Sequence, residues 1–179
     1  ADTNRTINGS LSGSNLSVYT TDSQAANVGA SIGLGGMSTT PAGFEFYGTM
    51  AGRKENSTNL DSSGYLAFYT QRVAVGHVER MRIDSLGNVG IGTDSPVTNA
   101  AYNKLLQINA TSGVGAVLKL TDTTTGAAEA DGFELLQYGA TSYLMNREAG
   151  DMNFRTSNLQ RMVIQAGGNV GIGTTNPAV

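Results

Sequence analysis

The sequence predicts an all-β chain that builds one repeat twice and depends on association with other copies. Three observations lead to this prediction: a duplicated segment with strand periodicity, abundant glycine, and a small apolar content. Apolar residues make up 39 % of the 179 residues and aromatic residues 7 %, while glycine contributes 24. Because glycine has no side chain to bury, a compact monomer would have a thin core, and partner chains would supply the missing burial.

The repeat is visible in two segments that align with each other when Gly87 is placed on Gly168. Residues 79–96 read ERMRIDSLGNVGIGTDSP, and residues 160–177 read QRMVIQAGGNVGIGTTNP. The run GNVGIGT is identical in both, and identity over such a run in one frame indicates a genuine internal repeat. We therefore expect two tandem repeats, residues 1–98 and 99–179, each contacting mainly its neighbour.

Each copy is expected to end in a β-hairpin. In the first copy, apolar residues alternate with polar ones, a turn sequence containing Gly87 follows, and apolar residues then alternate with glycine. The second copy repeats the pattern, so the same positions should face inward in both. The predicted structural seam consists of Met81, Ile83, Val89, Ile91, Met162, Ile164, Val170 and Ile172.

Glycines hold the alternate positions of the second strand of each hairpin, namely Gly90, Gly92, Gly171 and Gly173. A strand face without side chains usually marks the close approach of another backbone, here either a neighbouring chain or a tight bend of the sheet. The run also has the Gly-x-x-Gly-x-Gly spacing of a phosphate-binding loop. Pro96 or Pro177 follows where such a loop needs a helix, so we expect no nucleotide and no cofactor.

The rest of the chain is predicted to form short strands separated by clusters of Gly, Ser, Asn and Asp. The expected strands are residues 15–20, 29–35, 44–49, 65–70, 105–109, 116–121, 133–138 and 152–155. One or two helical turns are expected in residues 99–106, at the junction of the repeats.

Charge and cysteine content exclude several function classes. Charged residues amount to 14 % and the net charge is −3, so we expect no nucleic-acid partner, which would require a basic surface. No apolar stretch is long enough to cross a bilayer, and no signal peptide opens the chain, so no membrane insertion is expected. The absence of cysteine excludes disulfides and thiolate chemistry.

The segment ERMRIDSLGNVGIGTDSP resembles the repeats of bacteriophage tail-fibre and appendage proteins. Residues 29–36, 51–56 and 64–70 are similar to the segments that lead into the hairpin of those fibres, and residues 143–148 resemble a shorter variant. The resemblance covers most of residues 13–179. It marks an architecture and does not identify a ligand.

The resemblance implies an extended homotrimer of interleaved short strands and hairpins, a β-prism- or β-helix-like stalk. It further implies a location in the virion as part of a tail fibre, assembly in the bacterial host cytoplasm, and contacts with other tail-fibre or virion proteins. A bacterial surface glycan is a further expected partner. Fibres of this kind often end in an endosialidase-type intramolecular chaperone, a pattern from which residues 1–179 depart.

Candidate catalytic and metal-binding residues are few. His77 is the only histidine, is expected to be exposed in a loop at residues 75–78, and has only Glu79 nearby, so we expect no metal site. Glu45 and Glu134 recur at matched places in the two copies, which favours a structural role over catalysis. The acidic residues considered for polysaccharide cleavage are Asp22, Glu45, Asp61, Glu129, Asp131, Glu134 and Asp151.

Two further groups have structural and functional interpretations. Arg80 and Arg161 recur beside methionine, and we expect each to pair with a carboxylate on a neighbouring chain rather than with a ligand. Aromatic side chains in strands usually pack across the sheet, but they also stack on sugars. The tyrosines with these two interpretations are Tyr47, Tyr65, Tyr69, Tyr138 and Tyr143.

The leading hypothesis is a structural, non-enzymatic segment of a tail fibre that projects or spaces a receptor-binding tip, with weak glycan contacts multiplied by three-fold avidity. A glycan-binding adhesin module is the alternative. A polysaccharide-depolymerising tailspike segment ranks third, because no acidic constellation stands outside the repeats.

Overall fold

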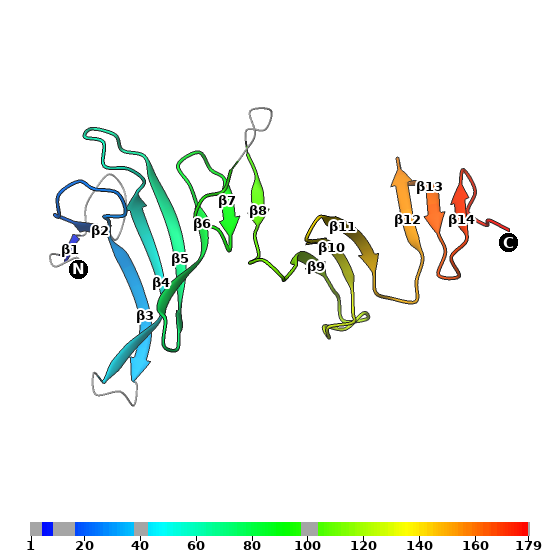
Figure 1. Ribbon diagram of the computed structural model, residues 1–179, viewed down its shortest axis with the longest axis horizontal. Coiled ribbons are helices and arrows are strands. Elements are labelled where there is room, and N and C mark those ends of the chain that lie inside the picture. Colours follow the sequence, from blue (N-terminus) through cyan, green and yellow to red (C-terminus); the bar gives the residue numbers. More distant parts are fainter. Residues whose placement is uncertain (1–4, 9–16, 38–42, 98–103, 179) are drawn as a thin grey trace. The chain divides into compact units, whose positions relative to one another are not determined.

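The computed structural model describes residues 5–8, 17–37, 43–97 and 104–178, and every regular element in these ranges is a β-strand (Figure 1). The prediction of an all-β chain is confirmed. The first strands are β1 (Arg5–Asn8), β2 (Ser17–Thr20), β3 (Ser31–Met37), β4 (Phe44–Lys54), β5 (Gly64–Arg72), β6 (Gly76–Ile83), β7 (Val89–Ile91) and β8 (Leu106–Ile108). The others are β9 (Ala116–Leu120), β10 (Phe133–Tyr138), β11 (Thr141–Asn146), β12 (Met152–Thr156), β13 (Leu159–Ile164) and β14 (Val170–Ile172).

The chain divides into two units. Ala1–Asn109 contains a six-stranded sheet of order β3-β4-β5-β6-β7-β8 and a ribbon of β1 and β2. Ala110–Val179 contains two three-stranded sheets, β11-β10-β9 and β12-β13-β14. The sequence predicts a boundary after residue 98, whereas β8 lies beyond that point and still belongs to the first unit, because it pairs in parallel with β7.

Most predicted strands correspond to observed ones, with shifted ends. The sequence misses β1 and β11, and residues 15–16 of the first predicted strand lie outside the described residues. The predicted helix at 99–106 is wrong where the structure describes it, since Lys104 and Leu105 have no helical structure and Leu106 begins β8. Residues 99–103 of that prediction lie outside the described residues.

Strand register gives the six-stranded sheet an apolar face and a polar face, because successive side chains alternate and paired residues share a face. One apolar row takes a residue from every strand: Ile32, Met50, Phe68, Met81, Ile91 and Ile108. The adjacent row contains Gly52, Leu66, Ile83, Val89 and Leu106. We call these two rows the apolar ladder.

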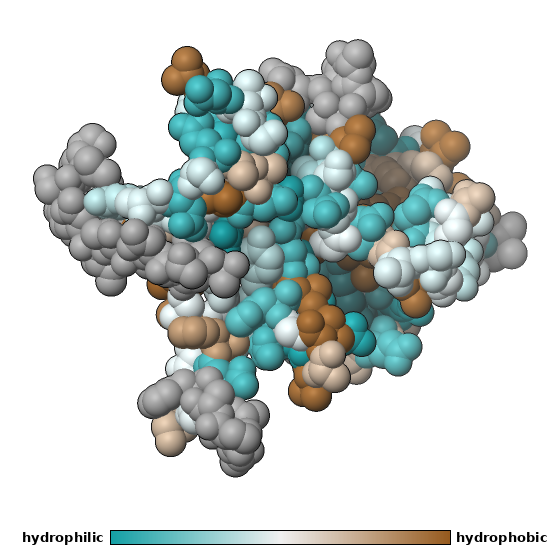
Figure 2. Space-filling model, turned by 60° about the vertical axis from the view of Figure 1, so that its left-hand side comes forward, coloured by the Kyte–Doolittle hydropathy of each residue, from teal (hydrophilic) through white to brown (hydrophobic). Residues whose placement is uncertain are grey.

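Burial of this sheet is the reverse of what a monomeric domain shows. On the polar face, Ala51 and Ala67 are only 1 % and 0 % exposed, and Thr93 lies directly over Gly90. On the apolar ladder, in contrast, Met50 and Ile91 remain 41 % and 38 % exposed. Figure 2 accordingly shows apolar side chains at the molecular surface. The side chains that gain most from leaving water are those left in contact with it.

The β11-β10-β9 sheet also separates apolar from charged side chains. Leu118, Leu135 and Leu144 form a row across its three strands. On the opposite face the buried Glu134 carboxylate lies 3.0 Å from Arg147 Nη2 and 3.7 Å from Lys119 Nζ. Because a buried carboxylate requires compensating charge, this three-residue cluster gives Glu134 a structural role.

The β6–β7 and β13–β14 hairpins repeat the same hydrogen bonds. The Asp84 amide donates to the Asn88 carbonyl at 3.0 Å and the Gly87 amide to the Asp84 carbonyl at 2.9 Å, and the equivalent bonds of the second hairpin measure 2.9 and 2.8 Å. Gly87 and Gly168 adopt φ of +81° and +91°, a left-handed conformation that glycine permits and that closes a three-residue hairpin loop. The sequence repeat is therefore a repeat of backbone geometry.

A β-bulge at Arg80 and Arg161 precedes each hairpin. The register of β5 with β6 and of β12 with β13 shifts there, leaving each arginine as the extra residue. Arg80 Nε donates to Thr70 Oγ1 at 2.7 Å, and Arg161 Nε donates to Thr156 Oγ1 at 2.9 Å. Within the chain, a threonine hydroxyl therefore holds each arginine, and the expected carboxylate on a neighbouring chain stays a prediction.

The hairpin glycines are of two kinds. Gly90 and Gly171 lie within β7 and β14, and a Cβ on either would lie 2.7 Å from the carbonyl oxygen of the threonine three residues along. Gly92 and Gly173 are not on the strand face where the sequence places them. They follow the strands in left-handed conformations with φ of +73° and +71°. For Gly90 and Gly171, the close approach comes from a tight turn of the same chain.

Replacing Gly92 with alanine is expected to disturb the protein more than replacing Gly173. Both changes force alanine into a left-handed conformation, at a cost of about 1–2 kcal/mol. Only at Gly92 would the new Cβ also lie against the Asn109 carbonyl oxygen, so that β8 must separate from β7. Hydrogen exchange of the Asn109 amide, which donates to the Ile91 carbonyl, should accelerate in Gly92→Ala and not in Gly173→Ala. Equal exchange in the two variants would contradict this.

Candidate functional site

The predicted seam residues lie on the apolar faces of two sheets. Met81, Ile83, Val89 and Ile91 belong to the apolar ladder. Met162, Ile164, Val170 and Ile172 occupy the equivalent face of the β12-β13-β14 sheet, beside Met152 and Phe154. In the single chain these residues are half-buried or exposed. Their burial against other chains stays a prediction.

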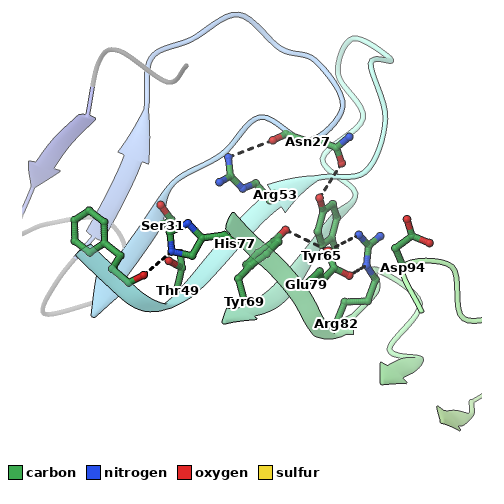
Figure 3. A pocket seen from close by; sticks show the side chains of 12 residues that line it. Asn27, Ser31, Thr49, Arg53, Tyr65, Tyr69, His77, Glu79, Arg82 and Asp94 are labelled. Carbon is green, nitrogen blue, oxygen red and sulfur yellow. Dashed lines mark hydrogen bonds and ion pairs between the residues drawn. The ribbon is translucent and has the colours of Figure 1, made fainter. Parts of the chain in front are cut away.

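The polar face of the six-stranded sheet carries a groove of about 670 Å³ (Figure 3). Alternate residues of β3 to β6 form most of it, and the segments around Asn27 and Asp94 border it. Its lining residues are Asn27, Ser31, Gly33, Phe46, Thr49, Arg53, Tyr65, Tyr69, His77, Glu79, Arg82 and Asp94. Aromatic rings, hydroxyls and balanced charges thus line one hollow within the first unit.

A connected set of side chains forms one end of the groove. The Arg82 guanidinium lies 4.0 Å from the centre of the Tyr65 ring and binds both carboxylate oxygens of Glu79, at 2.6 and 2.8 Å. Glu79 also accepts the Tyr69 hydroxyl at 3.2 Å, and Tyr65 donates to Asn27 Oδ1 at 2.8 Å. Burial, followed by electrostatic repulsion from Tyr65 and Glu79, raises the pKa of Tyr69, so its hydroxyl keeps its proton. The same Glu79 hydrogen bonds raise the pKa of Arg82.

His77 lies at the opposite end of the groove, where the sequence predicts a loop. It belongs to β6, because that strand begins one residue earlier, at Gly76, and its side chain is exposed as expected. Its Nε2 lies 2.8 Å from the Phe46 carbonyl oxygen, and since a carbonyl only accepts, Nε2 carries the proton. In the neutral form, Nδ1 then presents a lone pair. Among the described residues, no group of three His, Cys, Asp or Glu side chains is arranged to hold a metal ion.

Arg53 fastens the segment that borders the groove. Its Nη1 donates to the carbonyl oxygens of Asn27 and Gly29, at 3.2 and 3.1 Å. These contacts hold the chain before β3 against the end of β4. Arg53 therefore shapes the rim through backbone contacts, and the ion pairs described for this unit join Arg82 to Glu79 instead.

Several acidic residues considered for catalysis are engaged in local structure. Asp131 accepts the Ala128 amide at 2.7 Å and Asp151 accepts the Ala166 amide at 2.9 Å. In the first repeat, Glu55 accepts the amide of Ser85 at 2.7 Å, and Ser85 is the equivalent of Ala166. A carboxylate thus clamps the hairpin turn in both copies. These contacts favour structural roles for the carboxylates that make them.

Two of the five candidate tyrosines, Tyr65 and Tyr69, line the groove, while the other three do not. The groove also contains Phe46, Asn27 and Arg82, which were not singled out as site residues from the sequence. The sequence does predict that Tyr65 and Tyr69 lie together, because they are an even number of residues apart and therefore share a face of one strand. Which residues of β3, β4 and β6 join them depends on the pairing register, including two bulges.

Comparisons with known proteins add no relatives: no protein-family model matches the chain, and no curated protein sequence matches it. Among the described residues, no helix has the length and apolar character needed to span a membrane.

The loop between β4 and β5 should lose stability in acid. Hydrogen bonds from the hydroxyl and amide of Ser63, then from Asn56, lower the pKa of Asp61 from 3.8 to about 2. Because the folded pKa is depressed, the stabilisation is fully present above pH 3.8 and disappears as the pH falls through about 2. Carboxyl carbon NMR titration should give this pKa for Asp61. Asp61→Asn should remove the acid sensitivity of the Ser63 amide shift, and an ordinary pKa for Asp61 would contradict the assignment.

Proposed function

We propose that this chain is a non-enzymatic structural segment of a bacteriophage tail fibre that assembles as a homotrimer and projects or spaces a receptor-binding tip. The observation that carries the proposal is the exposed apolar ladder of the six-stranded sheet. A row with one apolar residue from each of six strands is regular and continuous, unlike the scattered apolar residues of an ordinary surface.

A further copy of the chain is the partner that these features favour. The second unit exposes apolar rows of the same kind, including Leu135 and Leu144 at 44 % and 48 %. Few large apolar side chains of the described residues are fully buried, Val163 being the main case. Association of like faces would cover the exposed apolar rows and would also supply the missing buried core. The resemblance of the repeats to tail-fibre proteins favours three chains around one axis.

Glycan binding is a second candidate function, and the groove on the polar face favours it. Phe46 is 54 % exposed and lines the groove together with His77 and Tyr69, and hydroxyl, amide and charged groups complete the lining. Flat rings flanked by hydrogen-bonding groups suit the apolar face and hydroxyls of a sugar. Since the groove lies on the face opposite the apolar ladder, the same chain could associate through one face and bind through the other.

Native mass spectrometry of the intact chain should give a mass three times 18.5 kDa, and a stable folded monomer would contradict the proposal.

Ile91→Asp places a charge in the apolar ladder and should weaken association, because each buried unpaired charge costs several kcal/mol. Val73→Asp is the matched control, since Val73 is 90 % exposed in the β5–β6 loop and should tolerate the charge. An unchanged oligomer in Ile91→Asp would exclude the ladder as the interface.

The glycan candidate predicts that an array of bacterial surface oligosaccharides will reveal binding by the intact chain. Phe46→Ala should then weaken the bound glycan roughly two- to tenfold, the range expected for loss of one stacking ring. Tyr138→Ala in the second unit is the control, because Tyr138 is 51 % exposed and outside the groove. The candidate fails if no glycan binds or if the two variants lose affinity equally.

A further inference from the structure

The two repeats differ at the outer edge of their second hairpin strand. In the first repeat, β7 pairs on one side with β6 and on the other with the parallel strand β8. In the second repeat, β14 has the same sequence, Val-Gly-Ile, and pairs with β13 in the same register. Among the described residues, β14 ends its sheet, and no strand occupies the place that β8 takes beside β7.

The β7–β8 pair shows what a strand needs in order to occupy this edge. The Val89 amide donates to the Leu105 carbonyl at 2.9 Å, and the Asn109 amide donates to the Ile91 carbonyl at 2.8 Å. Leu106 aligns with Val89 and Ile108 with Ile91, so both apolar rows continue onto β8. At the ends of the segment, Lys104 Nζ binds the Leu86 carbonyl, and Asn109 Nδ2 donates to the Gly92 carbonyl at 3.2 Å.

The corresponding positions of the second repeat are open. A Cβ on Gly92 would meet Asn109, and one on Gly87 would meet Lys104, whereas nothing lies within 4 Å of a Cβ on Gly173 or Gly168. Ile172 is 79 % exposed, twice the 38 % of its equivalent Ile91. The β14 edge therefore has the same backbone conformation as the β7 edge, but no strand covers it and its side chains are more exposed to solvent.

We propose that the outer edge of β14 is a docking site for an extended polypeptide segment that enters parallel to β14. Its required chemistry follows from residues 104–109, which read KLLQIN: lysine first, apolar residues third and fifth, and asparagine sixth. The third residue extends the row of Val170 and Ile164, and the fifth extends the row of Ile172 and Met162. The Val170 amide donates to the second residue, and the sixth residue donates to the Ile172 carbonyl.

The proposal does not depend on the homotrimer. Residues 104–109 of the same chain already pair with β7, so the segment that docks on β14 is a different stretch of polypeptide. Backbone hydrogen bonds supply most of the contact, while the exposed Val170 and Ile172 select for apolar residues at two alternate positions. Failure of strand docking would leave the oligomeric mass unchanged, and a monomeric chain would still present the β14 edge.

A capped peptide of sequence KLLQIN, titrated into the isotope-labelled 179-residue chain, tests the proposal. Amide hydrogen exchange of Val170 should slow by roughly tenfold at saturation, as for an amide newly bonded in a sheet. A peptide with aspartate at the third and fifth positions should give no effect, and the reversed sequence NIQLLK should bind much more weakly. Absence of protection at Val170 at the highest soluble peptide concentration, or equal binding of the reversed peptide, overturns the proposal.

Variants of the chain give a second readout. Gly173→Ala should abolish peptide binding, because the new Cβ takes the position that meets Asn109 in the first repeat. Gly168→Ala is the matched control, because it carries a similar left-handed strain, with φ of +91° against +71°. Nothing lies within 4 Å of its Cβ, and at the equivalent Gly87 a Cβ meets only the flexible Lys104 side chain, so the peptide lysine should adapt. Binding that survives Gly173→Ala, or is lost equally in both variants, contradicts the assigned edge.

Discussion

Strand alternation gives the six-stranded sheet a polar face and an apolar face, and the chain buries residues of the polar face while the apolar face stays in contact with solvent. On the polar face Ala51 and Ala67 are buried, Gly90 lies under Thr93, and the Arg82–Glu79 ion pair lines the groove, while the apolar ladder faces outward. Apolar burial is the main favourable term in folding, so a sheet of this kind gains most of its stability only when another surface meets the ladder. The proposed self-association follows from this imbalance, as does the orientation of the groove away from the interface.

An exposed ladder also makes register critical, because a slip of one residue would move every apolar side chain to the other face. Three local devices fix the register, and each occurs in both repeats. The turn closes with a left-handed glycine, Gly87 or Gly168. The bulged arginine is held by a threonine of the neighbouring strand. A carboxylate clamps the turn amide of Ser85 or Ala166. The two hairpins thus share the turn glycine within GNVGIGT, and also the arginine–threonine and carboxylate–amide contacts made by residues outside that run.

The sequence was sufficient for the elements with strong local signals. Alternation and glycine identified both hairpins and put Met81, Ile83, Val89 and Ile91 on one face, where the register places them. It failed where structure depends on distant pairing. Leu106–Ile108 is a strand, as its own pattern predicted, but its pairing with β7, which places it in the first unit, was not foreseen. Likewise, the groove joins residues of four strands, and the bulge at Arg80 decides that Glu79 lies opposite Tyr69. Neither contact leaves a trace in local periodicity.

Arg82 and Val163 occupy the same position of the repeated hairpin, paired with Gly90 and Gly171 respectively. One is a charged member of the groove, and the other is 1 % exposed within its own sheet. The backbone and the adjoining apolar rows are unaffected by this exchange. Along each strand, therefore, alternate residues are constrained differently: the apolar rows keep their chemistry in both hairpins, while the residue between them changes from charged to apolar. A chain built from such hairpins can vary the side chains on one face of its sheets from one hairpin to the next without altering the apolar pattern of the other face.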